Sequence, residues 1–206
     1  MLRRIVIGCA LLVLGASSAL GAQADSVRLG DASRVWFTGS SNLRRFTCRA
    51  RSVDGTVVLA TAKSGDAVTV GGRAVDGASI DIPAARLGCG PRAMNPHLRS
   101  ALGAKRHPTI TFRLDGVRAD SGDASAVTLS GRLTIAGRER PVHVRASVVR
   151  DPAGALHVTG THALDVREFG VVPPRRFLGL LRVHSEAVVH FNVVVPQPGG
   201  RTASGG

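Results

Sequence analysis

Residues 182–195 read Arg-Val-His-Ser-Glu-Ala-Val-Val-His-Phe-Asn-Val-Val-Val and carry the clearest fold signal in the chain. Every second residue from Val183 to Val195 belongs to one long, largely apolar face. The opposite face is expected to carry Arg182, His184, Glu186, His190 and Asn192. A period of two residues is typical of a strand with one buried face. Because a strand this long is more natural in a barrel wall than in a small sandwich, the stretch favours a β-barrel.

The same alternation continues outward from this stretch and covers most of the chain from Val27 to Val195. Strands are expected at 35–38, 56–60, 68–70, 79–82, 109–114, 127–135, 142–149, 156–161 and 182–195. Turns are expected at Asp54-Gly55, Asp76-Gly77, Asp115-Gly116 and Ala136-Gly137. One short helix is expected within 95–104, with Asn95 as its cap and Pro96 in its first position. The pattern predicts an all-β protein, an antiparallel barrel of about eight strands that leaves room for one small ligand.

The N-terminus has the features of a secretory signal peptide. Arg3 and Arg4 precede an apolar run to Leu14, and 22–24 read Ala-Gln-Ala, a pattern that signal peptidase recognises. The run is shorter than the roughly 20 apolar residues that a membrane span needs. The sequence therefore predicts a signal peptide over 1–24, cleaved near Ala24, and a periplasmic or secreted protein. The barrel domain is expected over 25–195 and a disordered tail over 196–206.

The chain carries a formal charge of +13, of which Arg3 and Arg4 would leave with the signal peptide. In the cytoplasm such a charge would favour nucleic acid as a partner, but outside it the available polyanions are anionic lipids. The arginines are scattered along the sequence and do not cluster on one expected strand or helix. This favours a solvated basic surface, and nucleic acid is not an expected partner.

Two cysteines, Cys48 and Cys89, remain once Cys9 has been removed with the signal. An even pair in an oxidising compartment favours a disulfide. A metal pair or a redox-active pair would be expected at Cys-x-x-Cys spacing, which these residues lack.

The histidines are the only candidates for acid–base or metal chemistry near neutral pH. They are His97, His107, His143, His157, His162, His184 and His190. His157 and His162 differ by an odd number and so belong to opposite faces of a strand, while His184 and His190 are separated by about 20 Å of extended chain. The chain also lacks a Gly-x-Ser-x-Gly motif and a phosphate-cradling loop. No catalytic residue, metal ligand or cofactor is predicted.

The large apolar residues are the candidates for contact with a ligand inside the barrel. They are Phe37, Phe46, Phe112, Leu133, Phe169, Phe177, Leu178 and Phe191, while Trp36 has the opposite parity from Phe37. The segment that begins at Pro173 is a candidate portal. In it, Arg175 and Arg176 could accept an anionic head group while an apolar tail enters beside Phe177 and Leu178.

Three motifs resemble the YceI-like family. They are Asn95-Pro-His-Leu-Arg-Ser-Ala with Lys105-Arg-His-Pro-Thr-Ile-Thr-Phe after it, Gly131-Arg-Leu-Thr-Ile-Ala-Gly-Arg-Glu-Arg-Pro-Val-His-Val, and Val166-Arg-Glu-Phe-Gly-Val. They occur in the family's order between Asn95 and Val171, and the order of the expected strands extends the resemblance over roughly Val27 to Val195. The resemblance implies a lipocalin-like barrel, export from the cytoplasm and binding of polyisoprenoids, with no established catalytic residues.

The favoured interpretation is an exported, non-enzymatic carrier or sequestering protein for an isoprenoid or another lipid-like amphiphile, without stable insertion into the membrane. A second interpretation is a ligand-free envelope module whose basic surface binds anionic glycolipid or a partner protein. A third is a metal-dependent or hydrolytic enzyme that uses the histidines.

Overall fold

The computed structural model describes residues 25–62, 68–90, 92–123, 125–176 and 181–198. Residues 1–24, which contain the expected signal peptide, lie outside this part, as do the last eight residues of the expected tail. The described chain is built almost entirely of antiparallel strands, with one α-helix and three short 3-10 helices. No helix in this described portion is long and apolar enough to cross a membrane.

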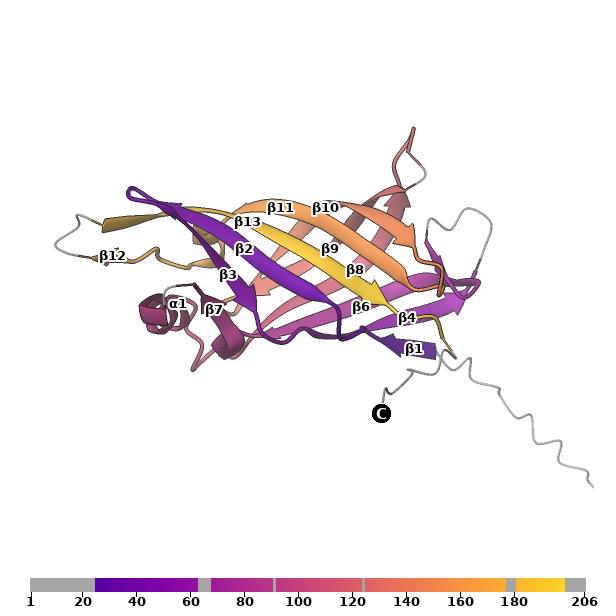
Figure 1. Ribbon diagram of the computed structural model, residues 1–206, viewed down its shortest axis with the longest axis horizontal. Coiled ribbons are helices and arrows are strands. Elements are labelled where there is room, and N and C mark those ends of the chain that lie inside the picture. The colour runs from indigo at the N-terminus through magenta and orange to yellow at the C-terminus, as the bar shows by residue number, and fades with distance from the viewer. Residues whose placement is uncertain (1–24, 63–67, 91, 124, 177–180, 199–206) are drawn as a thin grey trace, which may run out of the picture.

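The described strands all belong to one strongly curled antiparallel sheet of thirteen strands (Figure 1). They are β1 (Asp25–Arg28), β2 (Arg34–Ser41), β3 (Arg45–Ala50), β4 (Asp54–Thr61), β5 (Thr69–Val70), β6 (Arg73–Pro83), β7 (Leu87–Cys89), β8 (Thr109–Ala119), β9 (Ala126–Ile135), β10 (Arg138–Arg150), β11 (Leu156–Asp165), β12 (Arg175–Arg176) and β13 (Leu181–Val195). The main path runs β1-β4-β6-β8-β9-β10-β11-β13-β2-β3-β7, while β5 pairs with β6 and β12 with β13.

The two sides of the curled sheet come together where the chain passes from β1 to β2. The Leu29 N–H donates to the Gly55 carbonyl at 3.0 Å, and the Gly30 N–H donates to the Val194 carbonyl at 2.8 Å. This crossing links β4 to β13, which are not neighbours along the main path of the sheet. The predicted antiparallel barrel architecture with one short helix is confirmed, in the form of a half-barrel.

The number of strands exceeds the prediction of about eight. Nine expected segments correspond to strands, and β1, β3, β7 and β12 are additional. Each of these four has six residues or fewer, too short to show a clear alternation in sequence. In β3, for example, the inner face of the sheet carries only Phe46, Cys48 and Ala50.

The Asp-Gly pairs are not the turns that the sequence predicted. Gly55 lies inside β4, and Gly77 and Gly116 lie inside β6 and β8. Asp76 and Asp115 are each the extra residue at a register shift in their ladders, so both pairs form β-bulges. Ala136-Gly137 is a turn as expected, with φ angles of 50° and 77°, and it connects β9 to β10. Residues that favour turns thus also accommodate the bulges that curve this sheet.

The single α-helix, α1 (Asn95–Ala101), is confirmed, but the prediction that Asn95 caps it is wrong. Asn95 is the first helical residue and makes no cap hydrogen bond. Its side chain is buried, and Oδ1 accepts a hydrogen bond of 2.7 Å from the Cys89 N–H. The side chain therefore ties the helix to β7, because a buried backbone N–H at a strand end needs an acceptor.

Two apolar clusters occupy opposite ends of the shell (Figure 1). The first lies around α1 and β7 and comprises Ile82, Ala84, Leu87, Leu102, Ile135, Phe169 and Val171. The second joins β4, β5 and the far ends of β11 and β13, and it comprises Val57, Leu59, Val70, Leu156, Val193 and Val195. The space between these clusters is the interior of the half-barrel.

A candidate lipid-binding cavity

The interior of the shell holds a cavity of about 420 Å³. Its size falls within the usual range for small-molecule sites, roughly 300–1,000 Å³. Its wall consists of inward-facing side chains from β2, β3, β4, β6, β8, β9, β10, β11 and β13, and nearly all of these are apolar. Such a wall offers few hydrogen bonds to a polar ligand and favours an apolar one.

Five of the predicted ligand contacts line this cavity. They are Phe37, Phe46, Phe112, Leu133 and Phe191, which come from five different strands. Phe169 does not line it, because its side chain is 1% exposed and is packed in the cluster beside α1. Phe177 and Leu178 lie outside the described residues, as do the side chains of Arg175 and Arg176. The backbone of those two arginines forms β12, which pairs with the beginning of β13.

Three of the phenylalanine rings approach glycines of neighbouring strands closely. A Cβ atom added at Gly39 would lie 2.7 Å from the Phe46 ring, and one at Gly131 would lie 2.7 Å from Phe112. A Cβ atom at Gly160 would lie 2.6 Å from the ring of Phe191. Gly39 and Gly160 are the direct ladder partners of Phe46 and Phe191. Each ring occupies the space that a side chain at the glycine would fill. The ring therefore lies against the wall, and the interior stays open.

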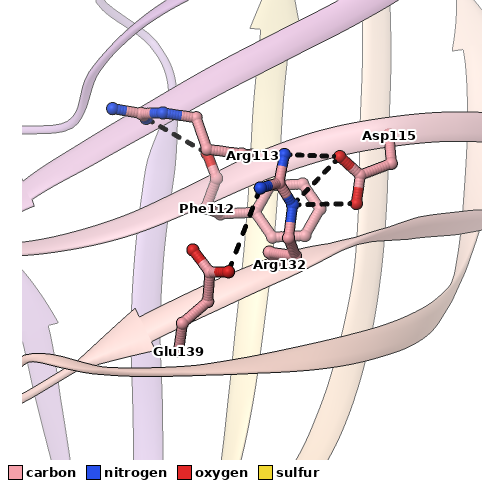
Figure 2. A network of polar contacts seen from close by, with 5 residues as sticks. All are labelled: Phe112, Arg113, Asp115, Arg132 and Glu139. Carbon is pink, nitrogen blue, oxygen red and sulfur yellow. Dashed lines mark hydrogen bonds and ion pairs between the residues drawn. The ribbon is translucent and has the colours of Figure 1, made fainter.

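The outer side of the wall at Phe112 is held by ion pairs (Figure 2). Arg132 of β9 bonds Asp115 of β8 at 2.9 Å and lies 3.9 Å from Glu139 of β10. Asp115 is the extra residue of the β8 bulge, and its hydrogen bond raises the pKa of Arg132. Figure 2 shows the Phe112 ring behind this network. The ion pairs join three strands at the surface, where solvent screens them and each contributes little to stability.

Apart from His162 of β11, the polar residues of the cavity wall gather at one end. Ser41, Arg44, His97, His184 and Glu186 lie where the β2–β3 hairpin, α1 and the beginning of β13 meet. The opposite end is lined by Val57, Leu156, Val193 and Val195. The cavity therefore has one apolar end and one polar end, which suits an amphiphile with a single head group.

Two of these polar residues were expected on the outer face. The sequence pattern placed His184 and Glu186 opposite the apolar face of 183–195, but both line the polar end of the cavity. The β13–β2 ladder contains a register shift between Val183 and Ala187, and the bulge turns this part of the strand. Alternation of apolar and polar residues cannot reveal this bulge, because both kinds of residue occur on each side of it in the sequence.

His162 is the polar residue on the inner face of β11. It alternates with Leu156, Val158 and Leu164, which all line the cavity. Burial lowers the pKa of His162 below its usual value, and nearby Glu168 opposes that effect. The sequence analysis did not propose His162 as a ligand contact. Its even spacing from the three apolar residues was the signal that could have identified it.

The other histidines of the strands make pairwise contacts. Three histidines bond hydroxyl groups: His143 Nδ1 with Ser130 Oγ at 3.0 Å, His184 Nδ1 with Ser40 Oγ at 3.1 Å and His190 Nε2 with Thr38 Oγ1 at 3.3 Å. His157 Nε2 donates to Asp151 Oδ2 at 3.1 Å. His190 also stacks on Trp36, with ring centroids 5.3 Å apart. Within the described ranges, no group of three or more His, Cys, Asp or Glu residues could hold a metal ion.

Cys48 and Cys89 form a disulfide beside the cavity. They are direct partners in the β3–β7 ladder, and their Cα atoms are 3.9 Å apart. β7 pairs with β3 over only three residues, so the disulfide adds a covalent link to a short ladder.

The family model of the YceI-like domain matches residues 29–195, which include every strand that lines the cavity. The chain belongs to the YceI-like family. The three sequence motifs that suggested the family lie within the matched region, and the YceI-like fold accounts for the curled sheet and its single helix. No curated protein matches the chain.

Solved structures share this fold at low sequence identity. BcnA of Burkholderia cenocepacia is 20% identical over 79% of this chain and 95% of its own, with a TM-score of 0.63. A polyisoprenoid-binding domain of Saccharophagus degradans, implicated in plant cell wall breakdown, is 14% identical over 85% of this chain and 100% of its own, with a TM-score of 0.64. The YceI protein of Campylobacter jejuni is 15% identical over 73% of this chain and 84% of its own, with a TM-score of 0.55.

Proposed function

We propose that this YceI-like protein binds a lipid-like amphiphile of the polyisoprenoid class and acts as a carrier or sequestering protein, not as an enzyme. The observation that carries the proposal is the cavity, which is apolar along most of its length and polar at one end. The apolar chain would lie against Phe37, Phe112 and Phe191, and the head group would lie near His184 and Arg44. A structural relative described as polyisoprenoid-binding has the same fold, which supports this ligand class.

The hydrophobic effect would supply most of the affinity. At about 0.8 kcal/mol for each buried methylene-sized group, one five-carbon isoprene unit would contribute roughly 4 kcal/mol. Association costs an estimated 4–15 kcal/mol in lost freedom of motion. A few buried isoprene units therefore suffice for stable binding, and contacts to the head group would mainly select among ligands.

We further propose that the protein works outside the cytoplasm. The signal-like pattern over 1–24 supports export, and the Cys48–Cys89 disulfide suits an oxidising compartment. Expression of the whole chain in a bacterial host, followed by intact mass measurement of the exported protein, tests this. The expected mature protein begins at Asp25, and retention of the whole chain in the cytoplasm would contradict export.

Mass spectrometry of lipids extracted from the gently purified protein tests the ligand class. The expected result is one class of amphiphile in reproducible amounts. Val158→Phe fills the cavity from the inner face of β11 and should reduce the amount recovered. Thr159→Phe is the matched control, because it places the same side chain on the exposed outer face one residue further on. Absence of any amphiphile from the wild type, together with no binding of added polyprenols, would refute the proposal.

A further inference from the structure

The fold gathers basic residues that are scattered in the sequence. Residues 32–53 and 82–114 contain no Asp or Glu. The two stretches lie side by side, because β3 pairs with β7 and the Arg51 N–H donates to the Arg86 carbonyl at 3.1 Å. Besides Arg34 at the beginning of β2, they carry nine exposed basic residues, which we call the basic rim: Arg44, Arg45, Arg49, Arg51, Arg86, Arg92, Arg99, Lys105 and Arg106.

The basic rim is not neutralised by neighbouring carboxylates. Among the described residues, the arginines that form ion pairs with Asp or Glu are Arg73, Arg113, Arg132, Arg145 and Arg167, none of which belongs to the rim. The acidic residues near the cavity opening, Asp165, Glu168 and Glu186, belong to η3 (Val166–Phe169) and to the strands β11 and β13 that flank it. The basic rim thus lies on the side formed by β3, β7 and α1, seen at the left of Figure 1.

Among the residues that the structure describes, the two most exposed large apolar side chains lie at the same end of the shell. Leu43 is 72% exposed at the tip of the β2–β3 hairpin, and Val172 is 78% exposed in the segment before β12. Both tips adjoin the beginning of β13, through Asn42 N–H to the Arg182 carbonyl and Val183 N–H to the Pro174 carbonyl. Val171, Pro173 and Pro174, on either side of Val172, line the cavity.

We propose that this end of the protein docks on an anionic lipid bilayer, with the basic rim over the head groups and Leu43 and Val172 inserted shallowly between them. Charge complementarity favours an anionic partner, since basic residues close to an anionic membrane each strengthen binding by about fivefold. The exposed apolar tips favour a bilayer over a soluble polyanion, because only the bilayer removes them from water. Docking of this kind is peripheral, and it holds the polar end of the cavity against the membrane.

Flotation of the full chain with vesicles tests the proposal. We expect binding to vesicles of equal parts phosphatidylglycerol and phosphatidylcholine, at least tenfold weaker binding to phosphatidylcholine alone, and weakening at high salt. Arg45→Gln with Arg99→Gln should weaken binding by roughly 25-fold. The matched control, Arg28→Gln with Arg118→Gln, removes the same charge from exposed positions on β1 and β8, away from the rim, and should change binding less than twofold.

The apolar tips separate a bilayer from a soluble polyanion. Leu43→Asn with Val172→Asn should weaken vesicle binding about fivefold or more and leave binding to single-stranded DNA unchanged. Equal losses in the rim and control variants, or no effect of the tip variants on vesicle binding, would overturn the proposal. Docking does not depend on the proposed ligand, so Val158→Phe should lose lipid and still bind vesicles. A Val158→Phe protein that no longer bound vesicles would overturn the docking surface as described.

Discussion

Gly39 and Phe46 face each other across the β2–β3 ladder, and the Phe46 ring occupies the space in which a side chain at position 39 would stand. A Cβ atom at Gly39 would lie 2.7 Å from Cζ and 2.9 Å from Cε2 of that ring. The same arrangement joins Phe191 to Gly160 and Phe112 to Gly131. The volume of the cavity therefore depends on glycines in its wall as much as on the aromatic residues that line it.

Gly39→Ala should reduce the length of apolar chain that the protein binds. The nearest atoms to the new methyl group all belong to the Phe46 ring, so the ring must move toward the interior. Overpacking of this kind costs about 1–3 kcal/mol of stability. Affinities for polyprenols of increasing length measure the effect, and Gly39→Ala combined with Phe46→Ala should restore space. Unchanged affinity for the longest chains would contradict this account of the wall.

Gly160→Ala should destabilise the protein more than Gly39→Ala does. At this position the added methyl group would meet the backbone carbonyl of Arg145 at 2.6 Å as well as the Phe191 ring. A backbone atom of a paired strand cannot rotate away, so the β10–β11 ladder would have to shift. Urea unfolding of the two variants side by side provides the comparison. Equal losses of stability would show that the neighbouring strand yields more easily than the structure indicates.

Removal of the disulfide should lower the free energy of unfolding, while the protein still folds. The bond joins residues 41 apart in sequence, for which the loop-entropy model gives about 4 kcal/mol. Cys48→Ala with Cys89→Ala suits this test because both side chains are buried. The variant should unfold at lower urea concentration than the wild type, and a reducing agent should shift the wild type alone. A reductant that left the wild-type midpoint unchanged would argue against a formed bond.

Acid should weaken the η3 segment through Asp165. Hydrogen bonds from the Arg167 side chain hold the pKa of Asp165 at about 2, and its Oδ1 also accepts from the Arg167 N–H. Because this pKa is lower in the folded protein, the contribution to stability is present above the unfolded value near 3.9 and is lost as the pH falls through about 2. Melting temperatures between pH 5 and pH 2 should fall more steeply for the wild type than for Asp165→Asn. Parallel curves would contradict this role.

His162 should make the protein less stable in mildly acidic solution. Burial lowers its pKa in the folded state, so the unfolded chain binds the proton more readily. The contribution of His162 to stability is therefore fully present above its pKa in the unfolded chain, near 6.5, and it declines as the pH falls below that value. His162→Leu places an apolar side chain among Leu156, Val158 and Leu164. The melting temperature of this variant should therefore depend less on pH between 7 and 5. A slope equal to that of the wild type would refute this.

The alternation of residues along the chain was sufficient to predict the class of fold and much of the cavity wall. Phe37, Phe112 and Phe191 were expected inside because they lie in strands whose period of two is unbroken around them. The error at His184 and Glu186 came from a bulge, and so did the errors at Asp76-Gly77 and Asp115-Gly116, whereas Asp54-Gly55 lies in a regular part of the β4–β6 ladder. The position of a bulge depends on the curvature of the whole sheet, so the local sequence alone does not determine it.

The basic rim shows a different limit of sequence reasoning. Arg45 and Arg92 are separated by more than forty positions, and only the pairing of β3 with β7 brings their two stretches together. A count of charges along the sequence therefore shows that positive charge is in excess, but it does not show where on the surface that charge lies. The scattered arginines predicted a basic surface without any particular patch. On one side of the shell, however, they form a single patch without carboxylates, the basic rim.

For the proposed carrier function, the polarity of the cavity would also limit how a ligand is exchanged. Its far end is closed by the packed cluster of Val57, Leu156, Val193 and Val195, and its polar residues other than His162 lie toward the β2–β3 hairpin. An amphiphile held in such a chamber enters tail first and must leave head first, by the way it came. A donor and an acceptor could not be engaged at the same moment, so delivery would proceed by alternating visits and not by passage through the barrel.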